Sequence, residues 1–173
     1  MAERERYASA PEFPEAQAAL ARHLVAVVAR LEPQCLGLYW PMRSEFNAPQ
    51  AIAAEPGLSE LALALPFCRR PPREMHYRTW DGATPTLLDE CAIPSASGAE
   101  IVPDVVIAPC VGLTAAGYRL GYGGGYFDRW LAAHPGATVV GVAWSCAELD
   151  AMAFEVQAHD IAMMAVVTER GVR

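Results

Sequence analysis

The sequence contains no lysine, and all thirteen of its basic residues are arginine. A Walker-type phosphate loop and a Schiff-base enzyme both depend on a lysine amine, so both are excluded. The formal net charge is -7 at pH 7 over 173 residues. Because a nucleic-acid binder needs a positive face to release counterions, we expect no nucleic-acid partner. The length suits a single domain with a substantial core, which we expect to span residues 1–173.

Closely spaced cysteines and long apolar runs are also missing. The five cysteines are odd in number, widely spaced and without a Cys-x-x-Cys pair, so neither a disulfide framework nor a zinc cage is expected. No stretch approaches the roughly twenty apolar residues that cross a bilayer. The N-terminus carries charges of both signs, unlike a secretory signal. These features predict a reduced, soluble, cytoplasmic protein with no membrane partner.

Short apolar runs alternate with helical patterns along the chain. Residues 14–31 have apolar side chains at helical spacing and predict an amphipathic helix. Further helices are predicted at 48–55 and 125–133, strands at 35–40, 61–65, 75–80, 104–109, 138–144 and 165–168, and an extended surface crossing at 82–103. Residues 104–109 are apolar throughout, which is typical of a parallel strand buried on both faces. The pattern predicts an α/β fold: a three-layer Rossmann-like sandwich with a mostly parallel central sheet and helices on both faces.

The strongest chemical signal is a glycine-rich segment, residues 117–129, between a predicted buried strand and a predicted helix. In such folds ligands bind outside the carboxyl ends of the strands. Gly123–Gly125 lack every Cβ, so their backbone N–H groups can approach a phosphate closely. Arg119 and Arg129 flank the loop as candidate phosphate ligands. Asp128 either complements the helix dipole or holds a magnesium ion that bridges phosphates.

A plain steric turn is the alternative interpretation of this segment. Aromatic, arginine and aspartate side chains are interleaved with the glycines, a composition that favours ligand binding over a turn. The dinucleotide-binding fingerprint does not fit, because Tyr126 stands where its last glycine is required.

The same segment resembles the 5-formyltetrahydrofolate cyclo-ligase family, also called methenyltetrahydrofolate synthetases. The motif that carries the likeness comprises Asp104-Val-Val-Ile-Ala-Pro109, Gly117, Arg119-Leu-Gly121, Gly123-Gly-Gly-Tyr126 and Asp128-Arg129, with Phe127 in place of a second tyrosine. The likeness extends on both sides of this motif, to residues 38–45, 139–143, 159–160 and 166–169. The resemblance therefore extends over about residues 14–170.

The resemblance implies an ATP-dependent ring closure. ATP phosphorylates the formyl oxygen on N5 of the folate, N10 attacks the activated carbon, and loss of phosphate leaves 5,10-methenyltetrahydrofolate and ADP. The implied substrates are a reduced folate and ATP, the implied metal is Mg²⁺, and the implied assembly is a monomer or homodimer.

Residue roles follow from the motif. The resemblance implies catalytic roles for Arg119 and Tyr126, and a magnesium-binding role for Asp128. It implies that ATP is bound by Arg119, Gly121, Tyr122, Gly123, Gly124, Gly125, Tyr126 and Phe127. It implies that the folate is bound by Glu45, Tyr122, Gly123, Gly124 and Tyr126. Ordinary packing is the alternative role for the three aromatic side chains.

The sequence departs from the family pattern at three places. The family's N-terminal lysine and arginine, which clamp ATP, would fall before Met1, and Arg4 and Arg6 are the substitutes within reach. A charged N-terminus is usually a frayed, solvated end. Thr114 and Met164 stand where the family has aspartates. Two explanations are open for the missing clamp: a start codon upstream of Met1, or a chain that lacks the segment.

These departures leave rival hypotheses. One is a folate- or nucleotide-binding member of the same fold with impaired catalysis; another is an enzyme acting on a sugar phosphate. His159 is a candidate general acid or base, or a structural histidine. Arg69, Arg70 and Arg73 form a basic patch that either receives an anionic tail, such as a polyglutamyl chain, or is an exposed loop.

Overall fold

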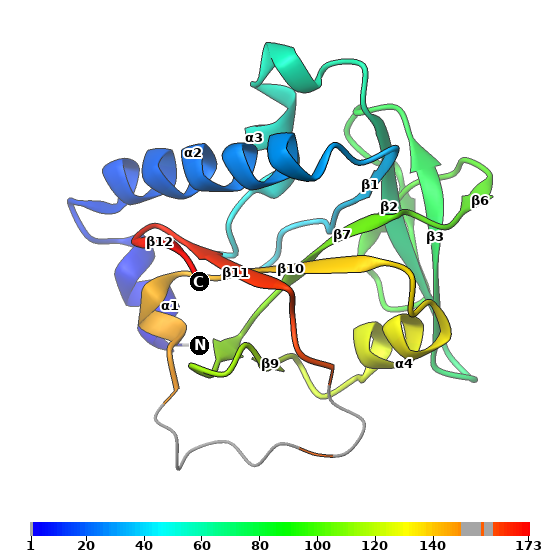
Figure 1. The fold of residues 1–173 in the computed structure, drawn as a ribbon. Helices are drawn as coiled ribbons and strands as arrows, with labels where there is room; N and C mark the ends of the chain where they lie inside the picture. The colour runs from blue at the N-terminus through cyan, green and yellow to red at the C-terminus, as the bar shows by residue number, and fades with distance from the viewer. Residues whose placement is uncertain (1, 150–156, 158–160) are drawn as a thin grey trace.

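A computed structural model describes residues 2–149, 157 and 161–173, and one eight-stranded sheet organises them (Figure 1). Its strands are β1 (Cys35–Gly37), β2 (Ala62–Arg69), β3 (Glu74–Trp80), β6 (Glu100–Ile101), β7 (Val105–Pro109), β10 (Thr138–Val142), β11 (Ala165–Thr168) and β12 (Gly171–Val172). Their order is β12-β11-β10-β7-β1-β2-β3-β6. The central strands β11, β10, β7, β1 and β2 are parallel, and β12, β3 and β6 pair antiparallel at the edges. The predicted mostly parallel sheet is confirmed.

Helices cover both faces of this sheet. Helices α2 (Phe13–Leu31) and α3 (Ala48–Ala53) lie on one face, and α4 (Tyr126–Ala133) lies on the other (Figure 1). Strand β7 packs against both helical layers. Val105 and Ile107 lie in the core under α2 and α3, whereas Val106 and Ala108 lie in the core under α4. The unbroken apolar run therefore belongs to a strand buried on both faces, and the three-layer prediction is confirmed.

The first predicted helix is confirmed nearly to the residue as α2. Leu20, Leu24 and Val28 are fully buried along one stripe, as their spacing predicts. The helix ends where Glu32 adopts a left-handed conformation, with φ of 46°, immediately before Pro33.

Strand β2 was predicted to stop before Pro66, and that prediction is wrong. The strand continues through Pro66, which pairs with Tyr77 of β3. The parallel partner β1 pairs with β2 only at residues 62–64, so Pro66 faces no ladder on that side and its missing N–H costs no strand hydrogen bond there. Its carbonyl accepts a hydrogen bond of 2.6 Å from Ser95 Oγ.

The N-terminus was expected to be a frayed end, and that expectation is also wrong. Residues Ala2–Ala8 form helix α1, which packs against η2 (Ser145–Ala147). The Tyr7 ring contacts the Trp144 ring at 5.7 Å between centroids, and the Tyr7 hydroxyl donates to Glu169 Oε1 at 3.1 Å. A seven-residue helix is marginal alone, so these tertiary contacts stabilise it.

The remaining elements are short. Residues 82–103, predicted as a surface crossing, contain the paired strands β4 (Leu87–Leu88) and β5 (Pro94–Ser95) as well as β6. A second two-stranded ribbon joins β8 (Gly112–Leu113) to β9 (Arg119–Leu120), and η1 (Pro56–Leu58) follows α3. Within the described ranges, no helix has the length and apolar character to cross a membrane.

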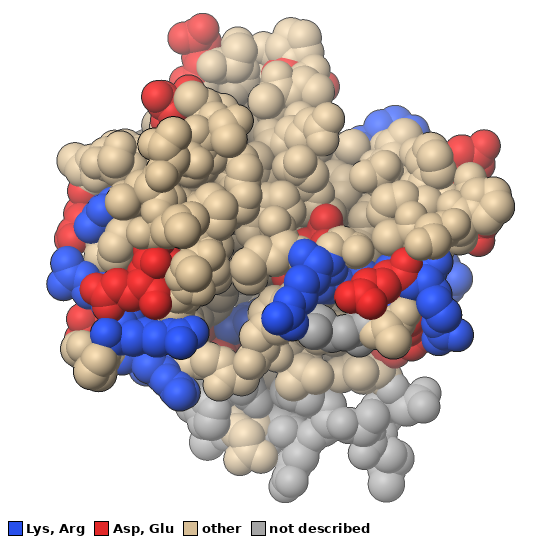
Figure 2. Space-filling view, turned by 180° about the vertical axis from the view of Figure 1, so that it is seen from behind, with Lys and Arg blue, Asp and Glu red and all other residues tan. Residues whose placement is uncertain are grey.

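Charged side chains of both signs gather in a band across the lower half of the face in Figure 2, on either side of a recess. Arginine and acidic groups stand next to one another in this band. The expected absence of a nucleic-acid partner stays a prediction, as do the cytoplasmic location and the single-domain organisation.

Candidate functional site

A cleft of about 530 Å³ lies at the carboxyl ends of β1 and β7, where an α/β fold is expected to bind its ligand. The segment after β1 contributes Glu45 to its lining, and β7 contributes its last residue, Pro109. Residues 119–128, which contain the glycine loop, form much of the rest. The cleft thus gathers the predicted folate and ATP residues around one space.

Glycine is required at several positions of the loop. Gly123 has φ of 79°, and Gly125, the N-cap of α4, has φ of 64°, both in the left-handed region that side chains disfavour. A Cβ on Gly124 would lie 2.7 Å from the Tyr126 ring. A Cβ on Gly121 would lie 2.9 Å from Arg119 Nη1. The glycines therefore serve the steric needs of the loop and also make room for the Arg119 guanidinium.

Arg119 is the buried cation of the site. Its side chain is 5% exposed, and Nη2 donates to Asp128 Oδ1 at 2.8 Å in an ion pair across the loop. The guanidinium lies 5.1 Å from the centre of the Phe127 ring. Nε is buried and has no hydrogen-bond partner among the described residues. Because Arg119 lines the cleft with a charged fork that suits phosphate oxygens, this geometry favours an anionic ligand beside the loop.

Arg129 has a different place from the one its sequence position suggested. Its Nε donates to the Arg73 carbonyl at 3.0 Å, and its Nη2 donates to the Gly124 carbonyl at 2.7 Å. The guanidinium also lies 5.5 Å from the centre of the Tyr126 ring. Through these contacts Arg129 anchors the glycine loop to Arg73, and its role as a phosphate ligand stays a prediction.

Glu45, Tyr122 and Arg4 meet in a hydrogen-bonded cluster, although they come from three distant segments. The Tyr122 hydroxyl donates to Glu45 Oε1 at 2.9 Å and accepts from Arg4 Nη2 at 2.7 Å. Arg4 Nη1 lies 3.8 Å from Glu45 Oε1, and the two side chains are 7% and 4% exposed. The Met42 N–H donates to Glu45 Oε2 at 2.9 Å. We call these three side chains the Glu45 cluster.

Burial sets the protonation of this cluster. Desolvation raises the pKa of Glu45, against the opposing effects of the Met42 N–H, the Tyr122 hydroxyl and the Arg4 charge. Desolvation also raises the pKa of Tyr122, so its hydroxyl keeps the proton that it donates. A carboxyl group with a raised pKa beside a cleft can exchange a proton with a ligand as well as accept hydrogen bonds.

Trp144 links the Glu45 cluster to the docked helix α1. Its ring lies 5.8 Å from the Phe46 ring, next to Glu45, and it also packs against Tyr7 of α1. Its indole N–H donates to the Ser44 carbonyl at 2.9 Å. One aromatic side chain therefore holds both the segment that carries Glu45 and the helix that carries Arg4.

Tyr126 lies where the glycine loop enters α4. Its hydroxyl donates to the Arg69 carbonyl at 3.2 Å and accepts from the Cys91 thiol at 3.3 Å. Burial and the neighbouring Cys91 raise the pKa of Tyr126. Tyr126 therefore stays protonated at neutral pH and faces the cleft as a neutral hydroxyl and a ring.

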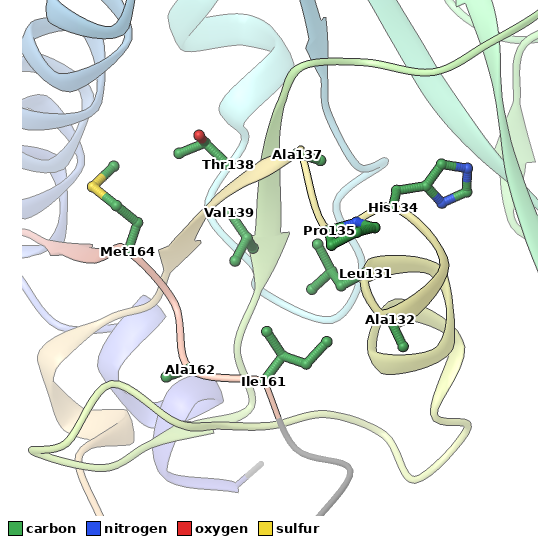
Figure 3. Close-up of a pocket in the computed structure, with 10 residues that line it drawn as sticks. All are labelled: Leu131, Ala132, His134, Pro135, Ala137, Thr138, Val139, Ile161, Ala162 and Met164. Atoms are coloured by element: carbon green, nitrogen blue, oxygen red, sulfur yellow. The ribbon is translucent and has the colours of Figure 1, made fainter.

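Thr114 and Met164, which stand where the family has aspartates, lie in different parts of the structure. Thr114 Oγ1 accepts the Tyr118 N–H at 3.1 Å and so closes the turn between β8 and β9. Met164 is 53% exposed and lines a second cavity of about 420 Å³ beside α4 and β10 (Figure 3). Met164 is not among the residues that line the cleft. His159 and Asp160 lie outside the described residues.

Sequence reasoning undervalued Arg4. Arg4 and Tyr7 are three residues apart, so they share one side of α1, and that spacing is the signal that points to a docked helix. One pair of residues at this spacing does not by itself predict a docked helix, because the contacts that dock α1 come from residues far along the chain.

Comparison with known proteins identifies the family. The model of the 5-formyltetrahydrofolate cyclo-ligase family matches residues 1–169. A 5,10-methenyltetrahydrofolate synthetase from Mycoplasma pneumoniae is 16% identical, with a TM-score of 0.72 over 97% of this chain and 94% of that one. An Aquifex aeolicus 5,10-methenyltetrahydrofolate synthetase is 23% identical, with a TM-score of 0.74 over 99% and 88%. The comparison with curated proteins gives no match. The family match, which spans nearly the whole chain, and the shared fold show that this protein belongs to the 5-formyltetrahydrofolate cyclo-ligase family.

Proposed function

We propose that the protein catalyses the ATP-dependent cyclisation of 5-formyltetrahydrofolate to 5,10-methenyltetrahydrofolate, with release of ADP and phosphate. The observation that carries the proposal is the Arg119 guanidinium, which lines the cleft beside the glycine loop and is held by Asp128. Family membership supports ATP and a reduced folate as the substrates. No comparison supports the alternative of a sugar phosphate.

The reaction makes demands that these residues suit. The formyl oxygen bonds to the γ-phosphorus while the bond to ADP breaks. N10 then attacks the formyl carbon and loses its proton, and the oxygen leaves as part of phosphate. Both steps need neutralisation of phosphate charge and positioning more than covalent catalysis by the protein. In our proposal Arg119 and the N–H groups of residues 121–127 supply the positive field.

The Glu45 cluster suits the folate. Glu45 offers a buried carboxyl group that accepts N–H donors of a pterin ring, and Arg4 with Tyr122 fixes its orientation. We place the rings of Tyr122, Tyr126 and Phe127 against the flat parts of the two substrates. In our proposal the Tyr126 hydroxyl exchanges its hydrogen bond to the Arg69 carbonyl for one to the phosphorylated oxygen when the substrates bind.

The site fits a magnesium ion through one protein ligand. The Asp128 side chain is 19% exposed and gives Oδ1 to Arg119, and Oδ2 is the atom that would take the metal. Mg²⁺ is commonly held by one or two carboxylates together with phosphate and water oxygens, and this donor set is compatible with that pattern. When bound, the ion would neutralise charge on the phosphate oxygens.

The test follows the absorbance of methenyltetrahydrofolate in the presence of ATP, Mg²⁺ and 5-formyltetrahydrofolate. We expect turnover by the wild type and by the control Arg30→Ala, an exposed arginine of α2, and none above background when ATP is left out. Arg119→Ala should lose most of the activity. If folded wild type shows no turnover at high enzyme concentration, the proposal fails. Thermal stabilisation by folate or ATP without turnover would instead establish the alternative, a binding member with impaired catalysis.

A further inference from the structure

A second group of chemically active side chains lies on the wall of the cleft, apart from the loop and the Glu45 cluster. Cys68, Asp89 and Cys91 have their two Sγ atoms and a carboxylate oxygen within 4.8 Å of one another. Among the described residues, these are the three His, Cys, Asp or Glu side chains whose ligand atoms lie close enough together to hold one metal ion. Asp89 and Cys91 are two positions apart, but Cys68 lies 21 positions before Asp89, so their sequence spacing gave no metal motif.

Local structure holds the three residues together. The Glu90 N–H donates to the Cys68 carbonyl at 3.1 Å, which ties the turn after β4 to the end of β2. Asp89 Oδ2 accepts the Cys68 N–H at 3.1 Å, and Oδ1 accepts the N–H groups of Cys91 and Ile93 at 2.8 and 2.9 Å. These bonds fix the carboxylate, as the outer partners of a metal ligand do. Each carboxylate oxygen has two lone pairs, so Oδ2 keeps one for a further partner.

We propose that Cys68, Cys91 and Asp89 form a binding site for a thiophilic divalent cation, Zn²⁺, with an open fourth position toward the cleft. Zn²⁺ takes thiolate and carboxylate ligands in a tetrahedron, which places its donor atoms about 3.5 to 3.8 Å apart. The donor atoms already lie within 4.8 Å of one another, so each pair needs to approach by no more than about 1.3 Å. Rotation of the two cysteine side chains would make this change, because hydrogen bonds hold the Asp89 carboxylate in place.

Charge also favours the ion. Two thiolates and one carboxylate around Zn²⁺ leave one net negative charge, and the Arg70 guanidinium is next to it, with Nε 3.2 Å from Cys91 Sγ. Arg70 is exposed, so it can leave the sulfur while still balancing the charge from nearby. Binding displaces one proton from each thiol to the solvent. Burial raises the pKa of the Cys68 thiol, so without a metal this thiol is protonated at neutral pH.

The position of the site gives the ion an effect on the cleft. All three residues contribute to the lining of the cleft, and the Cys91 thiol donates to the Tyr126 hydroxyl at 3.3 Å. A bound ion removes that thiol proton and frees the Tyr126 hydroxyl from this partner. Three protein ligands and an open position are the arrangement in which zinc accepts water or a group from a ligand.

Cobalt spectroscopy tests the site without any reference to turnover. Co²⁺ is titrated into the full-length chain under reducing, chelator-free conditions, and the thiolate-to-cobalt charge-transfer band is followed. We expect saturation at one equivalent and loss of the band when Zn²⁺ is added. Cys91→Ser should reduce the band to about half and weaken binding at least about tenfold, because one of two thiolates is lost. The double variant Cys68→Ser/Cys91→Ser should abolish the band.

The matched control is Cys146→Ser, since Cys146 is also partly exposed but lies outside the group. It should bind Co²⁺ as the wild type does. Thermal unfolding checks that each variant folds, and Cys91→Ser keeps the test decisive if buried Cys68 does not tolerate replacement. The proposal is overturned if folded wild type gives no saturable thiolate band, or if the band persists unchanged in Cys91→Ser.

Discussion

The two ends of the cleft are built in different ways. The glycine loop and its Arg119–Asp128 ion pair come from one continuous stretch, with Arg119 in β9 and Asp128 nine positions later in α4. The Glu45 cluster joins three segments, with Arg4 and Glu45 lying 118 and 77 positions from Tyr122. The ion pair of the loop end therefore joins residues close in sequence, with Tyr126 and Arg129 tying the loop to the Arg69 and Arg73 carbonyls, whereas the cluster end depends on the docking of α1. Substitutions at the two ends should affect different substrates.

The largest expected effect is at the loop end. Arg119→Ala removes the buried cation and leaves Asp128 without its partner, so we expect kcat to fall by about 10² to 10³. Arg119→Lys is the matched variant: it keeps the charge but not the planar fork, so it should recover part of the loss. Steady-state kinetics with ATP varied measures both. Equal activity of Arg119→Ala and wild type would show that Arg119 takes no part in the reaction.

The next effect is at the cluster end. Arg4→Ala removes a buried charged donor from Glu45 and Tyr122, so KM for the folate should rise about tenfold. Arg6→Ala is the control on the same helix, because Arg6 is exposed, and it should behave as the wild type. A rise in KM for ATP alone in Arg4→Ala would assign Arg4 to the phosphate end and break the comparison.

A smaller effect is expected at the contact that docks α1. Tyr7→Phe deletes the hydrogen bond to Glu169 and keeps the ring on Trp144, so unfolding should become easier by about 1 kcal/mol. KM for the folate should rise slightly and KM for ATP should stay constant. Urea unfolding and kinetics on one preparation check this, and a change in KM for ATP alone would contradict it.

The smallest effects come from two carboxyl groups with opposite pKa shifts. For Glu169, desolvation raises the pKa, but the hydrogen bonds from Ser145 and Tyr7 outweigh it and lower the pKa. Its ionised form therefore stabilises the protein above the unfolded pKa of about 4.3, and that stability is lost as the pH falls. Glu169→Gln should be most destabilising near neutrality and approach the wild type in acid.

Glu45 should behave in the opposite sense. Desolvation raises its pKa, so the wild type loses stability as the pH rises from the unfolded value of about 4.3 through the folded pKa. Relative to the wild type, Glu45→Gln should gain stability as the pH increases. Urea unfolding from pH 4 to 7 measures both variants. The same direction of change in both would contradict the assigned shifts.

The comparison also explains what the sequence could predict. The α2 stripe, the buried strand β7 and the glycine loop are local patterns, and each lies where expected because its own side chains decide its structure. Arg4 in the Glu45 cluster and the course of β2 through Pro66 depend on partners far along the chain. Arg129 shows the same limit, because its Nε–H group donates to the carbonyl of Arg73, 56 positions away.

Ligand-dependent thermal unfolding tests the central claim, that one cleft holds ATP at the loop end and the folate at the Glu45 cluster. ATP with Mg²⁺ and 5-formyltetrahydrofolate are added separately to wild type, Arg119→Ala and Glu45→Gln. A ligand at 100 times its Kd stabilises the folded state by about 2.7 kcal/mol. We predict that Arg119→Ala loses the shift caused by ATP and keeps the shift caused by the folate, and that Glu45→Gln does the reverse. Loss of both shifts together in folded variants, or wild-type shifts in both, would contradict the account.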